Sequence, residues 1–329
     1  MSSPAIQSAS GHAAQPTEMA DNARQVTMGS EHSLVKRILF PTDFSSCADH
    51  AEAYVAFLAK AYGATVTVVH VLEIYEGMYV TTIQDHSETD KRLADTVRRL
   101  TQPPVLATSQ QRAGIPDVVI CEAAAEDQAD LIMLGTHGRT GLQHILLGST
   151  AERVLTIAPC PVMTVREPKG RITCTHVVVP IDLSGCSFDA LEYGIQIAKD
   201  LGAALTLLHV LEPTSYGIDL TFEHAAEGNK RAVTSQLASV VNTIRSHGVS
   251  AQEVIRGGVP TDAILEFIRT SDCDLIVMGT HGRRGIAHVM RGSVAEAVLR
   301  RAPCPVLAVK IPKFPPGHQR MMPQPTEAL

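Results

Sequence analysis

Residues 135–149 read GTHGRTGLQHILLGS, and residues 279–293 read GTHGRRGIAHVMRGS. Both segments follow the spacing Gly-x2-Gly-x9-Gly-Ser and begin 144 residues apart. A glycine spacing of this length, written twice with the same first five residues, predicts two copies of one module.

The repeat extends well beyond the glycines. Residues 40–45 match residues 179–184, and residues 70–73 match residues 209–212, both 139 residues apart. Residues 158–162 match residues 302–306 at an offset of 144, so the second copy gained five residues between His209 and Gly258.

The length of 329 residues is about twice that of an ordinary domain. We therefore predict two domains with three further segments. The expected boundaries are a disordered tail at 1–33, a first domain at 34–167, a linker at 168–173, a second domain at 174–310 and an irregular tail at 311–329.

The composition is typical of a soluble globular protein, with 45% hydrophobic residues, 19% charged residues and a formal net charge of −6. A nucleic-acid partner is not expected, because proteins that follow phosphate backbones concentrate Lys and Arg. No apolar run reaches the roughly 18 residues that span a bilayer, and no secretion signal is visible. A cytoplasmic location without membrane contact is predicted, with the seven cysteines reduced.

Strand-length apolar runs alternate with helix-length amphipathic segments in each module, which is typical of a parallel sheet covered on both faces. The strands of the first module are expected at 35–40, 65–72, 104–112, 130–134 and 161–165. Helices are expected at 47–61, at 187–201 in the second module, and from Gly148-Ser149 to Ile157. Their predicted N-caps are Ser45 or Ser46, and Ser184. The predicted fold is α/β, with two tandem doubly wound five-stranded parallel sheets of strand order 3-2-1-4-5.

Such a sheet binds ligands outside the carboxyl ends of its strands, where the strand order reverses. Asp43 follows the first strand and Gly135 follows the fourth, so these two residues should face each other across a cleft. Gly135 and Gly138 would permit close backbone approach and positive φ, and the helix start after Gly148 would favour an anion.

The sequence leaves two roles open for each of two residues in this cleft. Ser149 either contacts a phosphate or caps the helix as its N-cap. Asp43 either accepts from a ribose hydroxyl, which is favoured because Asp182 repeats it, or forms an Asx-turn.

The combination of these motifs resembles the universal stress proteins, and specifically the tandem-domain members of their ATP-binding branch. The residues that carry the resemblance are Pro-x-Asp after the first strand, His-Val in the second, Gly-x2-Gly-x9-Gly-Ser, and Pro-Cys-Pro-Val at the last. It implies an adenine nucleotide alpha hydrolase-like fold, ATP with Mg as cofactors, and pairing of the last strands (161–165 and 305–309) into an internal pseudo-dimer. A homodimer of two chains and an unknown protein partner remain open.

The resemblance also implies the nucleotide contacts of both modules. In the first they are Pro41, Asp43, Val71, Gly135, His137, Gly138, Gly148, Ser149 and Thr150. In the second they are Pro180, Asp182, Val210, Gly279, His281, Gly282, Gly292, Ser293 and Val294.

Other candidate residues favour structural roles. His70 and His209 are interpreted as hydrogen-bonded histidines of the core, whereas His137 and His281 are either phosphate contacts or exposed loop residues. The cysteines at 160 and 304 lack a neighbouring base and are interpreted as small apolar groups. Packing is also favoured for Cys47 and Cys186, near helix starts.

Four functions remain open. There is no Walker A motif, no Gly-x-Ser-x-Gly and no His-Glu-x2-His, so binding with slow or absent hydrolysis is expected. The leading hypothesis is an ATP-binding regulatory protein, and the resemblance adds a role in stress or dormancy. The alternatives are a slow ATPase or a protein autophosphorylated at Thr140 or Ser149, a ligand-free scaffold, and a flavin or adenylate binder.

Overall fold

The computed structural model describes residues 33–73, 83–136, 147–167, 170–212, 220–280 and 292–323. Within two helices, the side chains of residues 83–86, 220–227 and 229 are not described. The first module contains β1 (Arg37–Pro41), α1 (Ser46–Tyr62), β2 (Thr65–Glu73), α2 (Ile83–Leu100), β3 (Ala107–Gly114), α3 (Pro116–Glu126), β4 (Leu131–Gly135), α4 (Ser149–Ile157) and β5 (Val162–Val165). The second contains β6 (His176–Pro180), α5 (Gly185–Leu201), β7 (Ala204–Leu211), α6 (Leu220–Ser246), β8 (Ala251–Gly257), α7 (Pro260–Thr270), β9 (Leu275–Gly279), α8 (Ser293–Arg301) and β10 (Val306–Val309).

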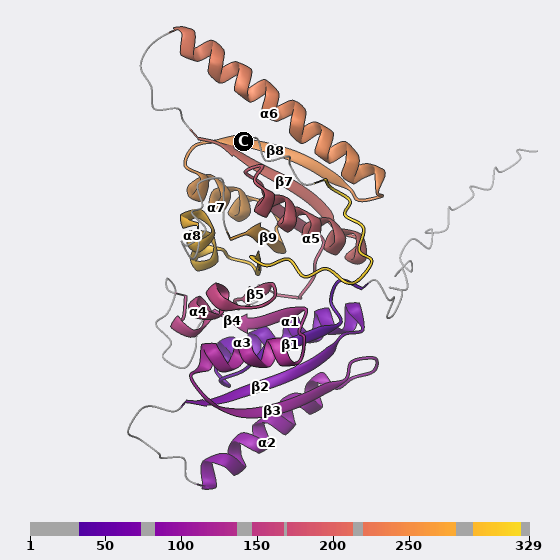
Figure 1. Ribbon diagram of the computed structural model, residues 1–329, viewed down its shortest axis with the longest axis vertical. Helices are drawn as coiled ribbons and strands as arrows, with labels where there is room; N and C mark the ends of the chain where they lie inside the picture. The colour runs from indigo at the N-terminus through magenta and orange to yellow at the C-terminus, as the bar shows by residue number, and fades with distance from the viewer. Residues whose placement is uncertain are drawn as a thin grey trace, which may run out of the picture.

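Across the described ranges, the strands form one sheet of ten in the order β3-β2-β1-β4-β5-β10-β9-β6-β7-β8 (Figure 1). The predicted order 3-2-1-4-5 is confirmed in the first module, and its mirror follows in the second. The pairings inside each module are parallel. The helices α2 and α6 lie at opposite ends of the elongated molecule (Figure 1).

Both faces of the sheet are buried, as the apolar strands predict. Ile38 and Phe40 of β1 pack with Ala51 and Val55 of α1. Leu39, between them, joins the helices of the other face in a second core. This alternation gives β1 the continuous apolar sequence of a strand that is covered on both sides.

The helix starts agree with the predicted caps. The Ser45 side chain accepts from the Ala48 N–H at 3.3 Å, and Ser184 accepts from the Ser187 N–H at 3.3 Å. At the other end, α1 stops at Gly63, whose φ of 62° is left-handed. These caps satisfy backbone groups that a helix end leaves open.

One strand boundary was predicted too early. β3 begins at Ala107 rather than at Pro104. The Val105 N–H donates to the Gln102 carbonyl at 2.7 Å, which closes a turn over residues 102–105. Pro104 has no N–H to give to a neighbouring strand, so a proline pair favours this turn over the sheet.

The two modules meet edge to edge. β5 and β10 pair antiparallel, with Met163 opposite Leu307 and Val162 opposite Ala308. The predicted pairing of the two last strands is therefore confirmed, and the sheet is continuous through the seam. Pro168 and Lys169 of the predicted linker lie outside the described residues.

Candidate functional site

A cavity of about 770 Å³ lies at the carboxyl ends of β1, β2 and β4 in the first module. This volume is in the range of small-molecule sites. The predicted residues that line it are Pro41, Asp43, Val71, Gly135, Gly148, Ser149 and Thr150. His137 and Gly138, with the Arg139 and Thr140 that follow them, lie outside the described residues, as do His281 and Gly282.

Asp43 stands at the tip of β1 in an Asx-turn. Its Oδ1 accepts from the Ser45 N–H at 3.0 Å, and Asp182 accepts from the Ser184 N–H at the same distance. The residue after each aspartate is left-handed, with φ of 59° at Phe44 and 66° at Leu183. Such a φ is uncommon for a bulky side chain, so the turn holds a strained strand tip in both modules, and in the first module this tip lies beside the cavity.

Gly135 has a different role from the one its sequence position suggested. Its φ is not in the left-handed region, so the prediction of positive φ is wrong for this glycine. A Cβ here would lie 2.8 Å from the carbonyl carbon and oxygen of Cys47, and Gly279 meets Cys186 in the same way. These glycines are therefore needed because the first turn of α1 packs against the end of β4, and the first turn of α5 against the end of β9.

The start of α4 corrects the reading of Ser149. Gly148 is the N-cap, with φ −61° and ψ 147°, and Ser149 is the first helical residue. Ser149 therefore does not cap the helix, and Gly292 and Ser293 repeat this arrangement at α8. The Ser149 side chain is exposed, and no hydrogen bond of its hydroxyl is found in the described part of the chain.

The helix start also offers backbone donors. The Gly148 N–H donates to the Thr136 carbonyl at 2.8 Å, which ties α4 to the end of β4. The next N–H groups, from Ser149 to Ala151, belong to the first turn and have no partner within the helix. Together with the positive end of the helix dipole, they suit an anion at the rim of the cavity.

The histidines of the second strands are core residues, as interpreted from the sequence. Nδ1 of His70 lies 2.8 Å from the Thr42 carbonyl oxygen, and Nδ1 of His209 lies 2.7 Å from that of Ile181. Both rings are buried. The two hydrogen bonds link the residues that follow β1 and β6 to the neighbouring strands, β2 and β7.

An arginine at the cavity was not predicted. The guanidinium of Arg92, from α2, lies 4.3 Å from the centre of the Phe44 ring and donates to the Phe44 carbonyl at 3.0 Å. The Phe44 ring packs in turn on His70, with 4.6 Å between ring centres. Leu93 and Leu237 are buried at equivalent positions of α2 and α6, so Arg92 corresponds to the exposed Gln236 of the second module. The two modules therefore differ in charge and in aromatic surface at this strand end.

The cysteines divide into two groups. Burial raises the pKa of Cys160 to about 12 and that of Cys121 to about 11, as expected for packed thiols. Cys304, interpreted as a second packed thiol, is only half-buried and contacts Cys273. In the part of the chain that is described, no three His, Cys, Asp or Glu residues gather as a metal site would require.

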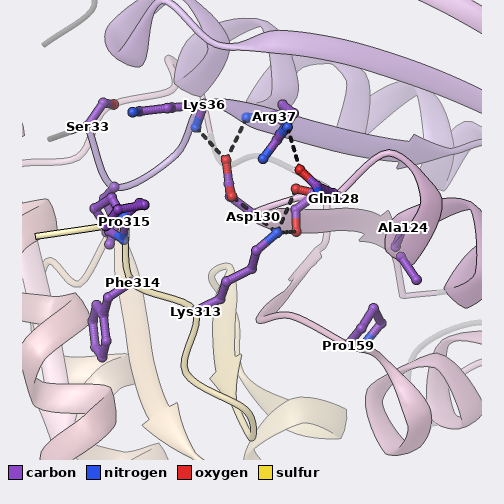
Figure 2. Close-up of a pocket in the computed structure, with 14 residues that line it drawn as sticks. Ser33, Lys36, Arg37, Ala124, Gln128, Asp130, Pro159, Lys313, Phe314 and Pro315 are labelled. Atoms are coloured by element: carbon purple, nitrogen blue, oxygen red, sulfur yellow. Dashed lines mark hydrogen bonds and ion pairs between the residues drawn. The ribbon is translucent and has the colours of Figure 1, made fainter. Parts of the chain in front are cut away.

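A second cavity, of about 640 Å³, lies at the opposite ends of the strands, between the first module and the C-terminal segment. Lys313 reaches across it to the carbonyls of Gln128 and Ala129, at 2.6 and 2.8 Å, and to Oδ1 of Asp130 at 3.3 Å (Figure 2). The other carboxylate oxygen of Asp130 accepts from the Lys36 and Arg37 N–H groups. The Asp130 carboxylate of this cavity is therefore already paired with Lys313, and the Arg37 guanidinium donates instead to Oε1 of Gln128 at 3.2 Å.

The predicted irregular tail is a docked segment over residues 311–323. It contains neither helix nor strand there, yet Met322 is buried and the Phe314 ring stacks on His318 at 4.5 Å. Figure 1 shows this segment, in yellow, leaving the seam and passing beside α5. Within the described residues, none of the helices is long and apolar enough to cross a membrane.

The fold and the first cavity together define a protein of two α/β modules, with a ligand-sized cleft where the strand order reverses. Comparison with known proteins gives the family. The sequence model of the Universal stress protein family matches residues 35–166 and 173–310. The chain therefore belongs to the universal stress proteins.

Similar proteins cover one module or both. A universal stress protein of Methanocaldococcus jannaschii is 36% identical over 140 residues, which are 42% of this chain and 82% of that protein. One of Synechocystis is 26% identical over 305 residues, which are 84% of this chain and all of that protein. The crystal structure of a universal stress protein from Archaeoglobus fulgidus has a TM-score of 0.68 at 24% identity, covering 84% of this chain and 98% of that one. This last likeness concerns the fold.

Proposed function

We propose that this chain is an ATP-binding regulatory protein of the stress or dormancy response, whose nucleotide occupancy changes a surface that a protein partner reads. The observation that carries the proposal is the cavity of about 770 Å³ with Asp43 on one side and the start of α4 on the other. The cavity offers an acceptor for hydroxyls and a set of donors for phosphates, as a nucleotide requires.

The proposed contacts follow from the lining residues. Asp43 would accept from the ribose, and the backbone at Val71 would face the adenine edge. The N–H groups of Ser149 and Thr150 would meet the phosphates. Mg²⁺ would accompany the triphosphate, because it prefers phosphate and carboxylate oxygens and keeps several waters.

The second module repeats the aspartate and the helix start, so we propose a second nucleotide site there. It has Leu183 and Val294 where the first module has Phe44 and Thr150. It lacks an arginine at the position of Arg92 as well. We expect the second site to bind ATP more weakly than the first.

Isothermal calorimetry with ATP and Mg²⁺ tests the proposal. Asp43→Asn keeps an oxygen for the Asx-turn but removes the charge, and we expect about tenfold weaker binding, equivalent to about 1.4 kcal/mol. Asp90→Asn is the matched control, because Asp90 is exposed on α2 outside the cavity lining. No ATP binding by the unaltered protein would favour the scaffold instead.

One observation favours a second candidate. The Ser149 hydroxyl is exposed at the rim of the cavity, where it could accept the γ-phosphoryl group of ATP, with ADP leaving. Intact mass after incubation with ATP and Mg²⁺ distinguishes the two functions. A phosphate added to the unaltered protein but not to Ser149→Ala would indicate autophosphorylation.

A further inference from the structure

Two cysteines of the second module lie side by side, outside the cavity described above. The sulfur atoms of Cys273 and Cys304 are 3.8 Å apart. Both residues are half-buried. All seven cysteines of the chain are free thiols in this structure.

The fold fixes this contact. Cys273 follows α7 and precedes β9, and Cys304 lies between α8 and β10. The strands β9 and β10 pair with Ile276 opposite Val306, and the Ile276 N–H donates to the Pro305 carbonyl at 3.0 Å. The two short loops therefore start from neighbouring strand ends, which holds the two sulfur atoms in place.

The first module provides an internal comparison. Cys160 occupies the position of Cys304, but Ala129 occupies that of Cys273. Cys160 is also buried, at 2% exposure. The paired and partly exposed thiols are thus a property of the second module that the repeat does not require.

We propose that Cys273 and Cys304 are an oxidative modification site, which forms a reversible disulfide when the protein meets a peroxide. The sulfurs must approach from 3.8 Å to about 2.05 Å. Rotation of the two side chains, which belong to half-buried residues, would supply this movement. Reversible cross-links of this kind are the ones found in reducing compartments.

The chemistry balances with hydrogen peroxide as oxidant. The Cys304 thiolate attacks one peroxide oxygen, the O–O bond breaks, and the leaving hydroxide takes a proton to become water. The Cys273 sulfur, losing its proton, then attacks the Cys304 sulfenic acid, so that the S–O bond breaks and a second water leaves. The two thiols lose two electrons and two protons, and one peroxide becomes two waters.

The hydrogen bond that the two thiols share, followed by burial, raises the pKa of the Cys273 thiol. A raised pKa suits Cys273 to the role of the second, resolving thiol, because the first attack needs a thiolate. Since a larger fraction of thiolate forms as the pH rises, the cross-link should form faster at pH 8.5 than at pH 7 (about a thirtyfold change in proton activity).

The test treats the full-length protein with hydrogen peroxide and follows intact mass, free thiols and a peptide map without reductant. We expect a loss of two hydrogens, a fall from seven free thiols to five, and one peptide pair joining Cys273 to Cys304 that a reductant separates. Oxygen added to either thiol without a cross-link, or a cross-link between other cysteines, would overturn the proposal.

Three variants test which thiols form the cross-link. Cys273→Ala introduces the alanine that the first module has at the equivalent position, Ala129. Cys304→Ala removes the other thiol of the pair. Both should abolish the two-hydrogen loss. Cys174→Ala is the matched control, a partly buried thiol of the same module, and it should leave the cross-link intact. An unchanged mass loss in Cys273→Ala contradicts the assignment.

Discussion

Asp43 and Asp182, which follow β1 and β6, show what a repeated aspartate does at the end of a strand. Its Asx-turn is present in both modules, so the structural reading of the sequence is correct as far as it goes. The same turn also orients the carboxyl group beside the cavity in the first module. A repeated residue with a structural role can therefore still be a candidate contact.

Gly135 gives a prediction at the scale of single residues. Replacing it by Ala would place a methyl group 2.8 Å from the Cys47 carbonyl, and backbone cannot yield as a side chain does. We expect Gly135→Ala to lower the free energy of unfolding by about 1–3 kcal/mol. Urea unfolding measures the change.

Gly228→Ala is the control for this substitution. Nothing lies within 4 Å of a Cβ at Gly228, which stands inside α6. Alanine there should stabilise the protein by about 0.5–1 kcal/mol, since it is the better helix former. Equal effects of the two substitutions would show that the Cys47 contact is unimportant.

Arg92 gives a prediction about binding. If ATP occupies the first cavity, the guanidinium beside Phe44 adds positive charge near an anionic ligand. Arg92→Gln, which introduces the residue of the second module, should weaken ATP binding at the first site several-fold and reduce its dependence on salt. Calorimetry at two salt concentrations measures both effects.

Arg98→Gln is the matched control for Arg92. Arg98 is exposed on the same helix and pairs with Asp95 at 2.8 Å, outside the cavity lining. It should leave ATP affinity unchanged. A similar loss in both variants would mean that general charge, rather than the position of Arg92, controls binding.

At the scale of elements, the sequence predicted the α/β alternation and strand order because apolar runs and helix periodicity are local signals. The start of β3 was missed because a proline pair closed a turn. The role of Arg92 was missed because its contact with Phe44 joins residues 48 positions apart. Composition likewise predicted an irregular C-terminal segment but not its docking, which depends on a partner in α5.

That partner is Glu192, whose side chain is fully buried. Its Oε1 accepts from the Met321 N–H at 2.9 Å and lies 2.9 Å from Nε2 of His318, and its Oε2 accepts from the Met322 N–H at 3.2 Å. A buried acceptor with several donors holds the segment against α5.

Glu192→Ala should therefore release residues 318–322. Loss of these hydrogen bonds should cost about 2–3 kcal/mol, and trypsin should cleave after Arg320 sooner than in the unaltered protein. Asp189→Asn, which weakens the partly exposed pair with Arg320 and leaves Glu192 in place, should cost less than about 1 kcal/mol. Equal digestion of Glu192→Ala and the unaltered protein would exclude this anchoring role.

At the scale of the whole molecule, the seam repeats its contacts about a pseudo-twofold axis. Arg166 donates to the Arg300 carbonyl at the end of α8, and Lys310 donates to the Thr156 carbonyl at the end of α4. A cation at a helix C-terminus satisfies open carbonyls and the negative end of the dipole. The two reciprocal contacts flank the β5 and β10 pairing.

Val306 tests whether this seam holds the modules together. It is buried at 1% exposure opposite Thr164 of the other module, so Val306→Lys must bury an ammonium group or open the strand pair. We expect faster protease cleavage in the segment between residues 166 and 174. Lys310→Met is the milder companion, because it removes one reciprocal contact and leaves the core of β10 unchanged. If Val306→Lys keeps native circular dichroism and both variants are digested like the unaltered protein, the strand pair does not hold the modules together.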